Sequence, residues 1–378
     1  MHLPRLAFLL ALTLIGCTAG DGGAAAQSQN RAFRVEELAT FNEPWAMTFL
    51  PSGQALITEK HGHLKLWTAG QPTIDVAGVP QVHYSGQGGL ADIVLHPDYA
   101  RNHLVYLSYA EPGPGDASGG VVARATLAID NGAARLDDLR VIWRQTPRMD
   151  GEQYALRIAF GPDHLLYISS GERQHFDPAQ DMSGNLGKIV RLNDDGTPAA
   201  GNPFAAQGGV AAQIWSLGHR NPLGLAFAPD GSLWEDEMGP RGGDEVNLIR
   251  PGANYGWPRA SNGSHYDGRD IPDHGPGDGF EPPKVWWNPS ISPSSLIIYT
   301  GTMFPEWRGD ALIGALSGQA LIHVRIRGAN AEKADQWDMG TRIRDVAQAP
   351  DGSVFLLEDG GHGAGGGLFR LTPARHDG

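Results

Sequence analysis

Residues 225–237 read LAFAPDGSLWEDE, in which two apolar, strand-like runs flank a Pro-Asp-Gly turn. Pro and Gly provide the backbone angles that a tight turn needs, so this stretch predicts a β-hairpin. Related stretches recur along the chain: MTFLPSGQALITE (47–59), IVLHPDYARNHLVYLSY (93–109), IAFGPDHLLYISSG (158–171), VAQAPDGSVFLLED (346–359) and a weaker copy, MFPEWRGDALIGAL (303–316). Six copies of one hairpin indicate a repeat architecture.

A second strand-like segment follows several of these hairpins. The segments are HLKLW (63–67), GKIVRLN (187–193), ALIHVRI (320–326) and GLFRLTP (367–373). Two hairpins per repeat give a four-stranded sheet, which cannot bury both of its faces alone, so neighbouring sheets must stack. We therefore predict an all-β chain that folds as a six-bladed β-propeller of four-stranded blades, a single domain over residues 33–374. A β-sandwich is the alternative, and we expect long connections at about 111–150 and 259–296.

Composition narrows the classes of function. The 378 residues include 52 Gly and 27 Pro, only 19% are charged, and the net charge is −13. This acidic balance argues against a nucleic-acid partner, which requires a basic surface. An anionic ligand would need a local basic pocket.

The N-terminal segment has the pattern of an export signal. The apolar run at residues 6–15 follows Arg5 and is too short to span a membrane. It ends in Leu-Ile-Gly-Cys17, which resembles the lipidation box of bacterial lipoproteins. We predict a signal peptide at 1–17, a lipid on Cys17, a flexible tether at 18–32, and anchoring on the periplasmic side, at the outer membrane because Thr18 follows the cysteine. A soluble, secreted periplasmic protein is the alternative.

The stretch from residue 215 to 258 combines cationic side chains, Gly/Pro turns with exposed backbone carbonyls, and carboxylates. Arg220 and Asn221 stand in a Gly/Pro-rich turn, and the sequence EMGPRGGDE follows at 237–245. Arginine offers a fork of donors to a carboxylate, whereas turn carbonyls and acidic side chains are the oxygen ligands that calcium prefers. The stretch predicts a site for an anionic ligand beside a hard cation.

Five phrases, in order, resemble the pyrroloquinoline-quinone (PQQ) dependent soluble aldose sugar dehydrogenases of the glucose/sorbosone dehydrogenase family. They are SGQGGL (85–90), LGHRNP (217–222), EMGPRGGDE (237–245), NYGWP (254–258) and RIRDV (342–346). The resemblance implies a six-bladed propeller that uses PQQ and calcium to oxidise an aldose sugar at C1 to the lactone. Hydride would pass to PQQ, and electrons would pass on to a quinone or cytochrome acceptor.

The resemblance also assigns cofactor and substrate residues. Arg220 and Asn221 match the pair that binds PQQ, and Arg342 and Arg344 match a second arginine pair over the cofactor. Because Arg-Ile-Arg is a strand pattern, both arginines should project from one face. Gln87 matches a glutamine at the substrate face.

The implied metal ligands lie in the same part of the chain. Gly239 and Pro240 match positions whose backbone carbonyls hold the calcium next to PQQ. Glu245 and Tyr255 resemble positions of a second, structural calcium site.

The chain departs from the family pattern at the position of the catalytic base. In the phrase EQYALRIAF (152–160), alignment on Arg157 places Gln153 where the family has its catalytic histidine. A glutamine amide has no useful basicity. Glu152, next to it, is our first candidate for the base, with His83 or His175 from neighbouring loops as alternatives.

Two other functions stay open from the sequence. The chain could be a catalytically weakened PQQ- or sugar-binding propeller lipoprotein, or a structural propeller that presents a surface to protein partners. A lysine that some family members use on PQQ is also absent from the matching region, residues 315–319.

Overall fold

The computed structural model describes residues 31–360 and 365–374. The predicted signal peptide, the lipidation site at Cys17 and nearly all of the predicted tether lie outside the described residues. Where the structure is described, the chain is mostly β, and no helix in that part is long and apolar enough to cross a membrane.

In the described part of the chain, the strands form six four-stranded units. The first unit is β2 (Pro44–Phe49), β3 (Ala55–Glu59), β4 (His63–Trp67) and β5 (Ile74–Ala77), and the second is β6 (Leu90–Leu95), β7 (Leu104–Pro112), β8 (Ser118–Asp130) and β9 (Ala133–Arg144). The third is β10 (Ala155–Phe160), β11 (Leu166–Ser170), β12 (Lys188–Leu192) and β13 (Ile214–Leu217), and the fourth is β14 (Pro222–Phe227), β15 (Leu233–Glu237), β17 (Asp244–Ile249) and β19 (Val285–Trp287). The fifth is β20 (Pro293–Ile298), β21 (Ala311–Ala315), β22 (Ala320–Arg327) and β23 (Asn330–Asp338), and the sixth is β24 (Ile343–Gln348), β25 (Val354–Glu358), β26 (Gly365–Pro373) and β1 (Phe33–Asn42). The prediction of a mostly-β chain built from four-stranded sheets is confirmed.

Only short elements lie outside these units. They are the two-stranded pair β16 (Arg241–Gly242) and β18 (Gly263–Ser264), the single-turn helix α1 (Tyr99–Asn102), and the 3₁₀ turns η1 (Asp177–Gln180), η2 (Ala205–Gln207), η3 (Ala211–Gln213) and η4 (Pro305–Trp307).

The predicted Pro-Asp-Gly-type turns form tight hairpins in four of the units, but the prediction for the weaker copy at 303–316 is wrong in detail. That stretch holds only the second strand of its hairpin, β21, and the first strand, β20, lies upstream. In the fourth unit the Ala228 carbonyl accepts from Gly231 N–H at 2.9 Å, and Ala228 N–H donates to Ser232 O at 2.8 Å. Gly231 has φ +85°, a left-handed angle that glycine adopts without a steric penalty. The first, third and sixth units repeat this bonding at their own turns.

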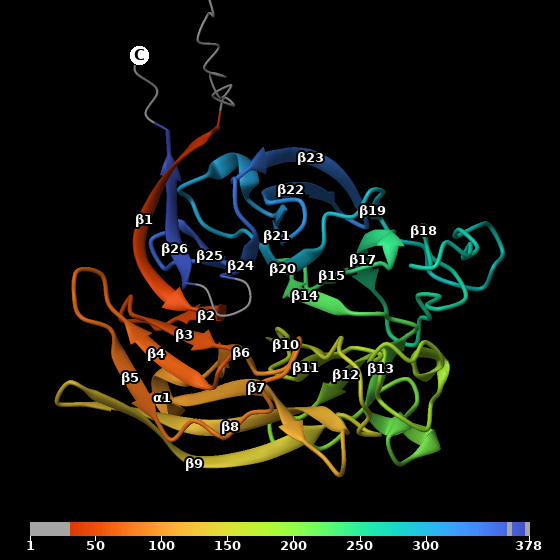
Figure 1. The fold of residues 1–378 in the computed structure, drawn as a ribbon, viewed down its shortest axis with the longest axis horizontal. Helices are drawn as coiled ribbons and strands as arrows, with labels where there is room; N and C mark the ends of the chain where they lie inside the picture. Colours follow the sequence, from red (N-terminus) through yellow and green to blue (C-terminus); the bar gives the residue numbers. More distant parts are fainter. Residues whose placement is uncertain (1–30, 361–364, 375–378) are drawn as a thin grey trace, which may run out of the picture. The chain divides into compact units, whose positions relative to one another are not determined.

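The six units close into a ring. The first strand of each unit contacts the first strand of the next, in the order β2, β6, β10, β14, β20 and β24, and β24 contacts β2 again. Figure 1 shows these six strands around the centre, with β9, β23 and β1 at the periphery. The N-terminal strand β1 pairs antiparallel with β26, so the two ends of the described chain complete the same unit. An apolar cluster containing Met47, Ile57 and Phe355 packs the sixth unit against the first.

One predicted connection is wrong. Residues 111–150 contain the long strands β8 and β9, joined at Asn131 and Gly132, both with positive φ. An Asn-Gly pair is a strong hairpin signal. β9 also pairs in parallel with β5, which joins the first two units in one eight-stranded sheet. The expected connection at 259–296 is mostly irregular, but it contains β18, β19 and the start of β20.

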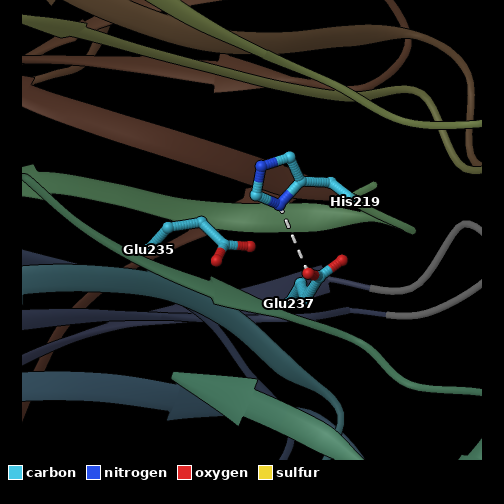
Figure 2. Close-up of side chains that lie close together, drawn as sticks. All are labelled: His219, Glu235 and Glu237. Atoms are coloured by element: carbon cyan, nitrogen blue, oxygen red, sulfur yellow. Dashed lines mark hydrogen bonds and ion pairs between the residues drawn. The ribbon is translucent and has the colours of Figure 1, made fainter. Parts of the chain in front are cut away.

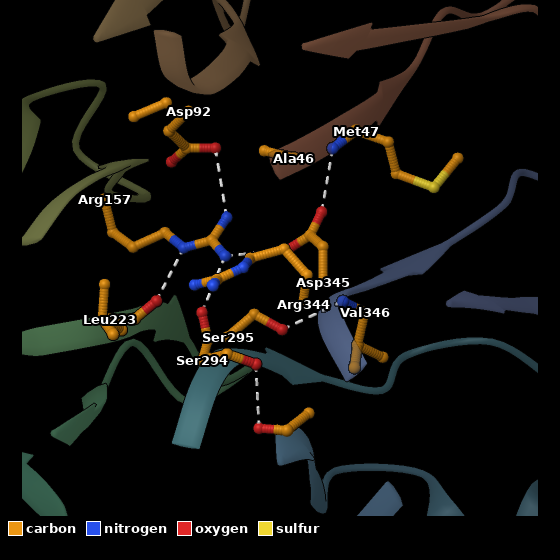
Figure 3. A network of polar contacts seen from close by, with 12 residues as sticks. Ala46, Met47, Asp92, Arg157, Leu223, Ser294, Ser295, Arg344, Asp345 and Val346 are labelled. Carbon is orange, nitrogen blue, oxygen red and sulfur yellow. Dashed lines mark hydrogen bonds and ion pairs between the residues drawn. The ribbon is translucent and has the colours of Figure 1, made fainter. Parts of the chain in front are cut away.

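Arg157, on β10, lies at the centre of the ring (Figure 3). Its guanidinium pairs with Asp92 of β6 at 3.3 Å and with Asp345 of β24 at 3.0 Å. It also donates to the backbone carbonyls of Leu223 in β14 at 2.6 Å and Ser294 in β20 at 2.8 Å. The guanidinium stacks on Trp45 of β2 at 4.3 Å, so this one side chain contacts the first strands of the other five units.

Candidate functional site

A cavity of about 590 Å³ opens at one end of the ring. It is lined by residues at or near the start of the first strand of each unit, and by residues that directly follow the second strand of several units. All six units contribute, for example through Glu43, Gln87, Glu152, Met238, Ser292 and Arg342. A second cavity of about 210 Å³ is lined by positions further along the same first strands, such as Phe49, Ile158 and Gln348. The two cavities therefore lie toward opposite ends of the ring, and Arg157 lies between them.

Arg342 and Arg344 lie side by side in the larger cavity. Arg342 Nε is 2.8 Å from Asp359 Oδ2, and Arg344 donates an N–H to Asp359 Oδ1 at 3.1 Å. Burial alone would raise the pKa of Asp359, but Arg344 and then Arg342 outweigh it and hold that pKa below its usual value. One carboxylate serves two guanidinium groups, so a net positive charge remains for an anionic ligand.

Arg220 and Asn221 stand immediately before β14 and are both buried. Arg220 donates to the backbone carbonyls of Met238 at 2.9 Å and Gly239 at 2.8 Å, and its guanidinium lies 5.3 Å from the Trp257 ring centre. Within the described residues, Arg220 Nε and Asn221 Oδ1 have no hydrogen-bond partner. Unpaired buried polar atoms are costly, and a bound ligand is one way to satisfy them.

Met238 connects this pair to the larger cavity. It lines that cavity and also a small one of about 10 Å³, whose wall includes Arg220 and Gly239. A volume of this size holds about one water molecule or one ion. Glu245 and Tyr255 line the same small cavity.

Three buried carboxylates gather next to the small cavity. Glu235, Glu237 and Glu245 all accept from the side-chain amide of Asn247, at 3.1, 3.5 and 3.3 Å. Burial, and then the charge of Glu237, raise the pKa values of Glu235 and Glu245 well above the usual range. Figure 2 shows His219 and Glu235 facing Glu237, and ligand atoms of these three residues lie within 4.8 Å of one another. Such oxygen-rich, uncompensated charge fits a bound cation.

The remaining predicted metal positions are placed as follows. Gly239 N–H donates to Asp244 Oδ1 at 2.8 Å, and its carbonyl accepts from Arg220. Pro240 is buried beside it. The Tyr255 hydroxyl donates to Leu248 O at 2.7 Å, so its phenol is already engaged and only other atoms of Tyr255 could reach an ion.

Gln153 is not among the residues that line the larger cavity. In the amide orientation that satisfies both neighbours, its nitrogen donates to Glu172 Oε1 at 2.6 Å and its oxygen accepts from Arg220 at 2.7 Å. Burial raises the pKa of Glu172. Gln153 therefore links the buried acid Glu172 to Arg220, and its backbone N–H donates to Gln87 Oε1 at 3.2 Å.

Glu152, in contrast, lines the larger cavity and is only partly buried. Its carboxylate has no hydrogen bond or ion pair within the residues that the structure describes. A Cβ atom at Gly86 would lie 2.2 Å from Glu152 Oε1, so the Glu152 carboxylate packs closely against the Gly86 backbone. Glu152 is thus an unpaired acid that can reach a ligand in the cavity.

Backbone strain is concentrated around this part of the third unit. Gln153, Leu156, Arg173 and Phe176 have φ between +58° and +75°, which non-glycine residues rarely adopt. Such strain persists where the surrounding structure requires it, often at functional sites.

The alternative bases do not reach the larger cavity. His175 Nε2 is 2.9 Å from Asp150 Oδ1, and neither His175 nor His83 lines the cavity. Two residues at the site were missed from the sequence, Lys60 in the cavity and Glu172 behind Gln153. Lys60 directly follows the second strand of the first repeat, and Met238 directly follows the second strand of the fourth. This equivalent position in the repeat was the signal that could have identified Lys60.

Comparison with known proteins gives consistent matches over most of the chain. The glucose/sorbosone dehydrogenase family model matches residues 41–370. Aldose sugar dehydrogenase YliI of Escherichia coli K12 is 38% identical over 341 residues, which cover 88% of this chain and 90% of that protein. The apo crystal structure of the soluble aldose sugar dehydrogenase from Escherichia coli superposes with a TM-score of 0.84 at 38% identity, covering 90% of this chain and 100% of that one. The PQQ-bound aldose sugar dehydrogenase of Streptomyces coelicolor gives 0.74 at 29% identity, covering 90% and 98%.

Proposed function

The chain belongs to the glucose/sorbosone dehydrogenase family of oxidoreductases, and from this premise we propose that it uses PQQ and calcium to oxidise aldose sugars at C1 to lactones. The ring of six four-stranded units is, in this proposal, the family's six-bladed β-propeller. The observation that carries the proposal is the convergence of Arg342, Arg344, Gln87 and Glu152 in one cavity that adjoins Arg220 through Met238.

The residues present fit PQQ, a flat tricarboxylate. Arg342 and Arg344 share a single carboxylate, and Arg220 has an unpaired, buried Nε. Asn221 adds an amide whose oxygen lacks a partner. Planar guanidinium groups bind carboxylates in a bidentate manner, and a volume of about 590 Å³ suits a ligand of this class.

The residues also fit calcium. The ion-sized cavity is lined by Gly239, Glu237 and Glu245, and the oxygens Glu235 Oε1 and Asn247 Oδ1 lie nearby without a hydrogen-bond partner. The Gly239 carbonyl already accepts one N–H from Arg220, but a carbonyl oxygen has a second lone pair for a metal.

Each residue then has a role in the reaction. When bound, PQQ supplies a quinone that accepts hydride, and calcium supplies a positive charge beside it. Glu152 takes the proton of the C1 hydroxyl, because its carboxylate is unpaired and lines the cavity. Gln87 hydrogen-bonds the sugar and holds its C1 in place, and Gln153 fixes Arg220 through its amide oxygen.

A second function is favoured by one observation. Gln153 stands between Glu172 and Arg220 and contributes no basicity, so a PQQ- or sugar-binding protein with weak catalysis also fits this site. A purely structural propeller does not account for the arginines gathered at one cavity.

Location and electron transfer complete the proposal. The motif that ends at Cys17 supports a lipid anchor on the periplasmic side, with a secreted soluble form as the alternative. A quinone or cytochrome would take the electrons from the reduced protein.

The test is reconstitution of the purified chain. Apo-protein is mixed with PQQ and calcium, binding is measured by calorimetry, and reduction of an artificial dye is followed with glucose and other aldoses. Binding with dye reduction supports the enzyme. Binding without reduction supports the weakened form, and no binding rejects both.

A further inference from the structure

The cavity contains a cation that belongs to none of the motifs above. Lys60 directly follows β3, the second strand of the first unit. The residues at the same place in the fourth, fifth and sixth units are Met238, Leu316 and Asp359, and all of them line the cavity. Its place in the repeat therefore brings Lys60 to the site.

The backbone of Lys60 is fixed against the Gly-rich segment at 85–89. Lys60 O accepts from Leu90 N–H at 3.0 Å, and Lys60 N–H donates to Glu43 O at 3.0 Å. A Cβ atom at Gly89 would lie 2.3 Å from Lys60 O, so only glycine permits this approach. Two hydrogen bonds and one close contact thus set the direction in which the side chain leaves the backbone.

The ammonium group of Lys60 has no ion-pair partner within 4.0 Å in the described part of the chain. Lys60 Nζ donates to Gly86 O at 3.1 Å and lies 5.6 Å from the Tyr84 ring centre. Burial lowers the pKa of Lys60, and the charge of Arg344 also lowers it. The charges of Glu43, Asp359 and Glu152 raise this pKa but do not outweigh burial. Two of these acids have other contacts, because Asp359 pairs with the two arginines and Glu43 accepts from the Tyr84 hydroxyl at 2.6 Å.

A partly desolvated cation without a close counter-ion is unfavourable unless a ligand supplies the negative charge. We propose that Lys60 binds an oxygen of PQQ, and so provides from the first unit the cationic contact that residues 315–319 do not offer. This inference rests on the proposed function, since it names a further contact to the same cofactor. Lys60 is a binding residue here and takes no proton from the sugar.

The experiment measures PQQ affinity of the full chain with saturating calcium, by calorimetry, for wild type, Lys60→Met and Lys60→Arg. Lys333→Met is the matched control, because Lys333 lies on the outer strand β23 against the Trp287 ring, outside the cavity. Loss of one charge-assisted contact should weaken the Kd for PQQ about 10- to 100-fold in Lys60→Met. Lys60→Arg should stay within about threefold of wild type, and the salt dependence of binding should be shallower in Lys60→Met alone.

Several results would overturn the inference. An unchanged Kd in Lys60→Met would reject Lys60 as a ligand of PQQ while leaving the proposed function intact. An equal loss in Lys60→Arg, or a higher KM for sugar at unchanged PQQ affinity, would assign Lys60 to packing or to the substrate instead. Wild type that binds no PQQ would reject this inference and the proposed function together. If Lys60→Met does not fold, Lys60→Gln replaces it, because glutamine keeps an N–H donor for Gly86.

Discussion

Replacing Arg157 with methionine should destabilise the ring severely. The guanidinium is the partner of two buried carboxylates, Asp92 and Asp345, at 3.3 and 3.0 Å. Removing one member of a buried ion pair costs about 3–5 kcal/mol, because the other charge is left unpaired. The carbonyls of Leu223 and Ser294 would also lose a donor, at about 1–3 kcal/mol each when no water replaces it. The total approaches the stability of a typical domain, about 5–15 kcal/mol.

The loss should depend on pH in a defined direction. Burial already raises the pKa of Asp345 to about 6. Without Arg157 this pKa should rise further, so Asp345 binds a proton more tightly in the folded than in the unfolded chain. The stability that this proton contributes is fully present below the pKa of Asp345 in the unfolded chain. It is lost as the pH rises through the pKa of Asp345 in the folded chain. The deficit of Arg157→Met relative to wild type should therefore be smaller at pH 5 than at pH 7.

Urea unfolding followed by tryptophan fluorescence measures both effects. Adding Asp92→Asn and Asp345→Asn to Arg157→Met should restore part of the loss at pH 7, because the two carboxylates that pair with Arg157 are then replaced by neutral amides. The control Arg325→Met removes an exposed pair with Glu332 and should cost less than about 1 kcal/mol. A stable Arg157→Met variant, or a deficit that does not change with pH, would refute this interpretation of the ring centre.

The other predictions concern the site. Glu152→Ala should lower kcat about 10²- to 10⁴-fold at unchanged PQQ affinity, and an unaltered kcat in steady-state assays would exclude Glu152 as the base. Gln153→His should raise kcat if missing basicity limits the rate, whereas an equal or lower kcat would show that the link to Arg220 matters more. Arg344→Met should weaken PQQ binding at least tenfold by calorimetry, and wild-type affinity would remove Arg344 from the site. Calcium at 100 times its Kd should stabilise the chain by about 2.7 kcal/mol in thermal melts, and this gain should be reduced in Glu245→Gln; an identical gain in that variant would place the ion elsewhere.

The sequence predicts those parts of the fold that depend on local turns. Pro-Asp-Gly and its variants fix a hairpin within a few residues, so the repeats could be counted and the strands of most of them located. The fifth repeat lacks such a turn, and its first strand, β20, lies outside the predicted stretch 303–316. Pairing between distant segments leaves no such local signal. Strand β1 pairs with β26 from the opposite end of the chain, and β5 pairs with β9 across two units. The expected long connection at 111–150 is instead the hairpin β8–β9, for which Asn131-Gly132 is the turn signal.

The positions of several candidate residues could be predicted where a motif specified them. Arg342 and Arg344 share one acid, as expected for an Arg-Ile-Arg strand, and Glu152 lines the cavity. The orientation of Gln153 was not predictable, because positive backbone angles turn its side chain toward Glu172 and Arg220. Lys60 was missed because its position follows from the geometry of the repeat and no motif contains it.

A crystal structure of the chain soaked with PQQ and calcium tests the assignment of the cavity most directly. We predict density for one PQQ molecule in the cavity lined by Arg342, Arg344 and Glu152, within reach of Arg220, and a metal next to Gly239. PQQ bound at the opposite end of the ring or on the outer surface, or an unoccupied cavity at saturating ligand, would contradict the assignment.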